Sequence, residues 1–158
     1  MSTIVTAADS AHFLALVPRL LGFTPTESLV VVPMTRGRSL GALRVDLPPA
    51  GVPLDSVAAT VVGMVCRVSD ADGFAAVVYT AASVHRELPG AELAHALERS
   101  AGACGLDIVD VLTVAGTGWG SHYDDRVPRG GRPLAALERY LPPVDGDQHG
   151  GAALPAVE

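Results

Sequence analysis

The chain has 158 residues, of which 49% are hydrophobic and 18% are charged, and its formal net charge is −6 at pH 7. This length and apolar content are enough to bury one core and favour a single compact domain. A general nucleic-acid-binding protein needs a basic surface for phosphates, so the acidic balance argues against nucleic acid as a partner. The longest apolar runs stop well short of the roughly 18 residues of a membrane span, and residues 1–8 contain no basic targeting region. We therefore expect a soluble cytoplasmic protein with no membrane partner.

The first part of the chain predicts a helix followed by two strands. Apolar side chains recur at helical spacing from His12 to Leu21, with Thr6 and Asp9 as possible N-caps. Residues 28–34 form a nearly continuous apolar run, which is typical of a strand covered on both faces. Residues 40–47 alternate between apolar and polar side chains, which predicts a hairpin partner with one wetter face.

A second helix and a buried strand are predicted next. The helix would be capped by Asp55 or Ser56. Its expected buried stripe consists of Val57, Val61, Met64, Val65 and Val68. The segment from Phe74 to Thr80 carries no charge on either face, which predicts the central strand of the sheet.

The remaining elements complete the predicted domain. A helix is expected from Gly90 to Ala103, ended by Gly102 or Gly105, and a strand from Leu106 to Ala115. A short amphipathic helix should follow from Leu134 to Leu141. The helix from Gly90 to Ala103 would bury the residues of its apolar stripe, which are Leu93, Ala94, Leu97 and Ala101.

The order of these elements predicts an α/β fold. We expect residues 1–143 to form a single α/β domain, a mixed four- or five-stranded sheet with helices packed on it. Residues 144–158 are rich in Gly, Ala and Pro, which predicts a disordered C-terminal tail. Cys66 and Cys104 lie in apolar helical patterns and are expected to be buried free thiols, with a disulfide as the alternative.

Four short blocks carry a resemblance to a known family. They are Pro18 to Val32, Arg44-Val45-Asp46-Leu47-Pro48, Val77-Val78-Tyr79 and Gly131-Arg132-Pro133-Leu134. In this order and spacing, over roughly residues 9–140, the chain resembles the actinobacterial family called domain of unknown function 4192. The resemblance implies an actinobacterial or actinophage origin but no established biochemical activity.

The segment from Gly116 to Asp125 is the best candidate for a site. Three glycines at alternate positions expose backbone amides, and the only Trp of the chain, Trp119, lies between two of them. The segment follows the carboxyl end of a predicted strand, where open α/β sheets generally hold ligands. The alternative is a strand that continues past Ala115 and packs Trp119 and Tyr123 against a helix.

Metal and nucleophilic sites are less well supported by the same segment. His122, Asp124 and Asp125 are suitable ligands for Zn²⁺ or Mn²⁺, but three ligands within four residues rarely all reach one ion. Ser121 and His122 are adjacent in sequence, and adjacent strand residues point to opposite faces. We therefore assign no catalytic residue, no metal ligand and no cofactor.

Two arginines are candidates for binding an anion. Arg44 and Asp46 share one face of a strand, where they form either an edge-strand ion pair or an anion clamp. Arg132 lies on a glycine-rich loop, where it either binds an anion or pairs with Asp124 or Asp125. The complete set of candidate ligand-binding residues is Arg44, Asp46, Tyr79, Trp119, His122, Tyr123, Asp124 and Arg132.

Two functions remain open. The leading hypothesis is a non-enzymatic binding or protein-interaction domain that self-associates or binds an unidentified protein partner, because the apolar fraction is high and no catalytic set is assembled. The alternative is a protein that binds a small anionic or nucleotide-like ligand, or an enzyme, with its site at the segment from Gly116 to Asp125.

Overall fold

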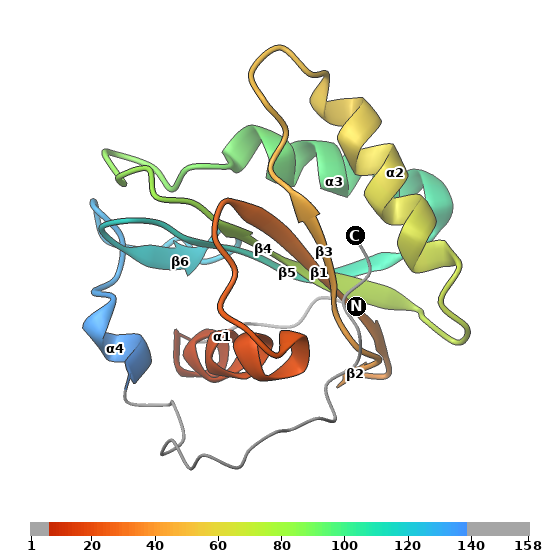
Figure 1. The fold of residues 1–158 in the computed structure, drawn as a ribbon, viewed down its shortest axis with the longest axis horizontal. Coiled ribbons are helices and arrows are strands. Elements are labelled where there is room, and N and C mark those ends of the chain that lie inside the picture. The colour runs from red at the N-terminus through yellow and green to blue at the C-terminus, as the bar shows by residue number, and fades with distance from the viewer. Residues whose placement is uncertain (1–6, 139–158) are drawn as a thin grey trace.

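A computed structural model describes residues 7–138 of the chain as one α/β domain (Figure 1). This confirms the predicted fold class. In chain order the elements are α1 (Ala7–Leu21), β1 (Ser28–Thr35), β2 (Arg38–Ser39), β3 (Leu43–Asp46), α2 (Leu54–Cys66), β4 (Gly73–Tyr79), α3 (Ala91–Cys104), β5 (Asp107–Val114), β6 (Trp119–Ser121) and α4 (Ala135–Glu138).

The strands form a mixed six-stranded sheet in the order β2-β1-β4-β5-β6, with β3 also paired to β1. β1 is antiparallel to β2, β3 and β4, β4 is parallel to β5, and β5 is antiparallel to β6. β4 therefore lies between two full-length neighbours, and all seven of its residues are buried. The prediction of a central strand from Phe74 to Thr80 is confirmed.

Two short strands account for the difference from the expected four or five. The predicted strand over residues 40–47 is shortened to β3, and β2 is an additional two-residue strand before it. The chain leaves the ladder between them around Gly41, whose φ is +120°. After β5 the chain does not continue as a strand. It turns at residues 115–118 and returns as β6, which pairs with β5 from Trp119 to Ser121.

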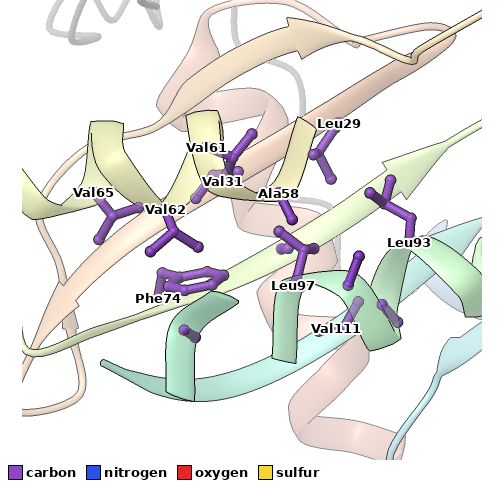
Figure 2. Close-up of a cluster of buried hydrophobic side chains, with 14 of the residues drawn as sticks. Leu29, Val31, Ala58, Val61, Val62, Val65, Phe74, Leu93, Leu97 and Val111 are labelled. Atoms are coloured by element: carbon purple, nitrogen blue, oxygen red, sulfur yellow. The ribbon is translucent and has the colours of Figure 1, made fainter. Parts of the chain in front are cut away.

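One face of the sheet is covered by α2 and α3, which lie side by side (Figure 1). Side chains of α2 and α3 meet those of β1, β4 and β5 in one apolar cluster (Figure 2). Burying such side chains is worth about 1.5–3 kcal/mol each, so this cluster is a main source of stability. It includes Leu29, Val31, Val61, Val62, Val65, Phe74, Val78, Leu93, Leu97 and Val111.

The opposite face is covered by α1 and the four-residue α4 (Figure 1). Because successive strand residues point to opposite faces, Ala75, Val77 and Tyr79 of β4 contact the cluster on this side. The same cluster contains Val17 of α1 and Trp119 of β6.

Helix ends depart from the prediction in detail. α2 begins after Pro53, which makes no side-chain cap, so the expected caps Asp55 and Ser56 lie inside the helix. Proline suits this position because its fixed φ is compatible with a helix start. The buried residues of α2 are Ala58, Val61, Val62 and Val65, whereas Val57, Met64 and Val68 of the expected stripe are half-buried.

The other helices follow their predictions more closely. α3 buries all four predicted residues and ends at Gly105, whose left-handed φ of +74° closes the helix. α4 covers the first part of the helix predicted from Leu134 to Leu141. The rest of that helix, Thr6 and the predicted tail at residues 144–158 lie outside the described residues. Between residues 7 and 138, no helix combines the length and apolar character that a membrane crossing requires.

The expectation of buried thiols is wrong. Cys66 and Cys104 are both free and exposed. Each is the last residue of its helix.

Candidate functional site

The glycine-rich segment forms the tight connection between β5 and β6, and each glycine has a packing reason. A Cβ atom at Gly116 would collide with the carbonyl of Ala81, and one at Gly118 with the carbonyl of Gly130. A Cβ atom at Gly120 would lie 2.9 Å from the side chain of Val127. The three glycines therefore allow three neighbouring chain segments to approach the hairpin closely.

The backbone amides of this segment are used inside the protein. Gly116 N donates to Ala82 O at 2.8 Å, and Trp119 N donates to Arg132 O at 3.0 Å. These donors face carbonyl groups of the protein itself, so the amides that the glycine pattern was expected to expose are not open to a ligand.

Trp119 is part of the core, with only 2% of its surface exposed. Its indole Nε1 donates to Pro133 O at 3.0 Å. The indole packs in the cluster beneath α1, which also contains Tyr79 and Leu112. No face of the ring is open to a ligand in this conformation.

Residues from the family-like blocks lie on one row across the sheet. Ser28 of β1 pairs with Asp46 on one side and with Tyr79 on the other. The row continues through Val114 and Trp119 to Arg132, which forms an isolated bridge with Trp119. Distant blocks of the sequence therefore meet in register, which explains their fixed order and spacing.

Arg44 and Asp46 form an ion pair at the outer edge of the sheet. Arg44 Nη2 lies 2.6 Å from Asp46 Oδ1, and Arg44 Nε donates to Ser28 Oγ at 2.8 Å. Ser28 Oγ in turn donates to Thr26 O at 2.7 Å. The guanidinium is thus held by groups of the protein itself, as an edge-strand pair.

Tyr79 is buried and does not face a cleft. Its hydroxyl has no hydrogen-bond partner among residues 7–138, and burial raises the pKa of this phenol. The side chain contributes mainly through its ring, which lies in the cluster beneath α1.

Asp124 and Arg132 form the second ion pair among the predicted residues. Arg132 Nη2 donates to Asp124 Oδ2 at 2.7 Å. Desolvation opposes ionisation of Asp124, but the hydrogen bond and charge of Arg132 outweigh it and lower the pKa of this carboxyl. The pair joins the two ends of the loop between β6 and α4.

His122 is held by a chain of two hydrogen bonds on the α3 side of the sheet. Thr113 Oγ1 donates to Pro89 O at 2.7 Å, so it accepts the second bond, of 2.8 Å, from His122 Nε2. Burial lowers the pKa of His122, which favours the neutral ring with Nδ1 unprotonated. Tyr123, the next residue, is 41% exposed, and burial and then the nearby Glu98 of α3 raise the pKa of its phenol.

A polar cleft of about 260 Å³ lies where His122 and Asp124 face the loop before α3. Its charged lining also includes Arg86, Glu87 and Asp125. Only His122 and Asp124 of the eight predicted site residues line it, because the other six lie in the core, in one of the two ion pairs or on the surface. Within the described part of the chain, no three His, Cys, Asp or Glu side chains are placed to hold a metal ion.

Sequence reasoning missed Asp110, a carboxylate that is only 5% exposed. Ser121 Oγ donates to its Oδ1 at 2.5 Å, and Ser10 Oγ of α1 donates to its Oδ2 at 3.4 Å. Desolvation raises the pKa of Asp110 despite these hydrogen bonds. The three residues come from α1, β5 and β6, so no local pattern in the sequence could have indicated them.

Asp110 should make stability depend on pH. Its carboxyl has a higher pKa in the folded than in the unfolded chain, so its stabilising contribution is complete below the unfolded pKa of about 4 and is lost as pH rises through the folded value. An Asp110→Asn variant has no carboxyl at this position, so it does not lose stability in this way as pH rises. We expect its melting temperature, relative to the wild type, to become progressively higher as pH is raised from 4 upward. Thermal melts at matched ionic strength measure this difference, and a difference that stays constant or narrows would contradict it.

Glu27 is the second residue that sequence reasoning missed. It has a left-handed φ of +44°, and its carboxylate accepts a hydrogen bond from Ala81 N at 2.5 Å. A non-glycine residue in this region of φ is uncommon and needs support from its surroundings. Here the carboxylate fixes the start of the loop after β4, which forms one wall of the cleft. The only signal in the sequence was the position of Glu27 within the first family-like block.

Comparison with known proteins agrees with the resemblance in the sequence. Searches of curated proteins and of solved structures give no match. Residues 11–140, most of the chain, match the model of one protein family. The chain therefore belongs to the family described as Domain of unknown function (DUF4192).

Proposed function

We propose that this chain is a non-enzymatic interaction domain that self-associates through the surface formed by α1. The main observation in support of the proposal is that the two faces of the sheet are covered by helices to different extents. Two long helices pack on one face, whereas the other face has α1 and the four-residue α4. Two of the five exposed large apolar side chains among the described residues, Leu16 and Phe23, lie on or just after α1.

Apolar side chains on this surface support the proposal. Leu16 is 40% exposed and Phe23, just beyond the end of α1, is 45% exposed. His12 and Arg19, on the same outward side, are also exposed. Aromatic and arginine side chains are enriched in protein interfaces, and a symmetric dimer would bring two copies of this surface together.

The distribution of polar groups also supports a non-enzymatic role. The candidate polar residues do not converge: Arg44 pairs with Asp46, and Arg132 pairs with Asp124. Catalysis requires a nucleophile or base that is oriented by a neighbouring acid and faces a substrate site. Ser121 is instead 2% exposed and hydrogen-bonded to Asp110.

Sedimentation velocity at micromolar concentrations tests the proposal. The wild type should sediment as a dimer or larger species, and Leu16→Glu or Phe23→Glu should raise the dissociation constant by at least about tenfold, since hot-spot residues contribute about 2 kcal/mol or more. Val52→Glu is the matched control, because Val52 is 38% exposed but precedes α2 on the other face. It should leave the association unchanged.

The result can go against the proposal in two ways. A wild type that is strictly monomeric across this range would exclude self-association. A dimer that all three variants weaken equally would show that α1 is not the contact surface. Thermal melts of the variants keep loss of folding separate from loss of association.

A small-ligand site is the second candidate, supported by the cleft at His122. The neutral ring offers Nδ1 as an acceptor, and the lining contains three carboxylates against one guanidinium. This charge balance favours a cationic or neutral polar ligand over the anionic one expected from the sequence. A strictly monomeric protein whose melting temperature rises with such a ligand would favour this candidate.

A further inference from the structure

The carboxyl ends of α2 and α3 lie next to each other. Each helix leads into one of the two parallel strands β4 and β5, so the helices run in the same direction and end at the same edge of the sheet (Figure 1). The connections that follow them are joined by a hydrogen bond from Asp107 N to Asp72 O at 3.1 Å. At that point a Cβ atom on Gly73 would press against the backbone of Asp107.

Packing between the helices aligns their last residues. Val62 and Val65 of α2 and Leu97 and Ala101 of α3 lie in the shared apolar cluster, most of them visible in Figure 2. Cys66 follows Val62 by one helical turn, and Cys104 follows Ala101 by three residues. The final residue of each helix is therefore a cysteine about one turn beyond a residue of the shared cluster.

The two thiols lie near each other and reach solvent. Cys104 is close enough to raise the pKa of the Cys66 thiol, and both cysteines are free and exposed. The ends of helices are also the parts whose backbone can most easily make the small shift that a disulfide bond requires.

We propose that Cys66 and Cys104 are a redox-active pair that forms an intramolecular disulfide by exchange with a low-molecular-weight disulfide. The thiolate of one cysteine attacks the small disulfide, forms a mixed disulfide and releases one thiolate. The second cysteine then attacks the mixed disulfide, closes the protein disulfide and releases the other thiolate. The protein loses two electrons and two protons, and the small disulfide is reduced to two thiols.

This bond would lock the ends of α2 and α3 together. It closes a loop from residue 66 to residue 104 and so restricts the unfolded chain more than the folded one. For a domain of this size, the chain-entropy argument predicts that the melting temperature rises by up to about 10 °C.

Titration of fully reduced protein with glutathione buffers of increasing disulfide content tests the proposal. Wild-type protein should lose both free thiols together, become lighter by about 2 Da as a monomer, and melt at a higher temperature. Partial desolvation and then the neighbouring Cys104 raise the pKa of the Cys66 thiol, so the rate should increase as pH is raised above 7.

Cys66→Ser and Cys104→Ser are the matched controls. Both residues are exposed, so the variants should fold and melt close to the reduced wild type. Each should accumulate a mixed disulfide with glutathione, heavier by about 305 Da, or a disulfide-linked dimer at high protein concentration. A wild type that forms only these same adducts, at any pH or glutathione ratio, would overturn the proposal.

Discussion

Replacing Val77 with aspartate is expected to leave the protein without a cooperative thermal transition. Val77 is 0% exposed at the middle of β4, and its side chain lies in the cluster beneath α1. Both neighbours of β4 are full-length strands, so the new carboxylate cannot reach water without opening the sheet. An unpaired buried charge costs several kcal/mol, which is comparable to the whole stability of a small domain. Far-ultraviolet circular dichroism and thermal melts of the purified variant measure the effect.

A matched control separates burial from the charge itself. Val52→Asp introduces the same carboxylate at a side chain that is 38% exposed in the loop before α2. Its stability should change by no more than about 0.5 kcal/mol. A Val77→Asp variant that is soluble and melts cooperatively near the wild-type temperature would contradict the central position of β4.

The sequence pattern predicted the centre of the fold well and its edges poorly. β4 could be predicted because its short uncharged run, bounded by turn residues, is typical of a strand buried on both faces. The short strand β2, the late start of β3 after Gly41 and the return of the chain as β6 depend on turns whose geometry follows from packing. Such turns are specified by contacts between distant segments, which periodicity does not record.

The candidate site shows the same limit. Arg44 and Asp46 were predicted to share one face because they are two residues apart on a strand, and they form an ion pair. Asp110 could not be predicted, because its partners Ser10 and Ser121 are distant in the sequence or lie on another strand. The alternate glycines were noticed, but the reason for them is the approach of three other chain segments.

The cysteines show that a correctly predicted helix can still give a wrong prediction of which side chains are buried. Cys66 lies one helical turn after the buried Val62, so the apolar pattern of the helix predicted a buried thiol, whereas the thiol is exposed. The stripe ends with the helix, however, and the sheet beneath it also ends there. The position of a residue along a helix therefore matters as much as the face on which it lies.

Truncation of Trp119 to alanine is expected to destabilise the protein by about 3–5 kcal/mol, because large-to-small substitutions of buried aromatic residues leave a cavity. Trp119 is 2% exposed, and its indole lies in the cluster beneath α1. The change also removes the hydrogen bond from Nε1 to Pro133 O, which helps to hold the loop before α4. For a domain of this size, the melting temperature should fall on the order of 10 °C.

Trp119→Phe is the control, since it keeps most of the apolar volume and loses only the indole donor. It should cost about 1–2 kcal/mol, clearly less than the alanine variant. Because Trp119 is the only tryptophan, intrinsic fluorescence reports on this position alone. Its emission should be that of a buried indole and should not respond to small molecules that bind at the His122 cleft, since Trp119 does not line that cleft. A Trp119→Ala variant that melts like the wild type would contradict the assignment of Trp119 to the core, and Trp119 would again be a candidate ligand-binding residue.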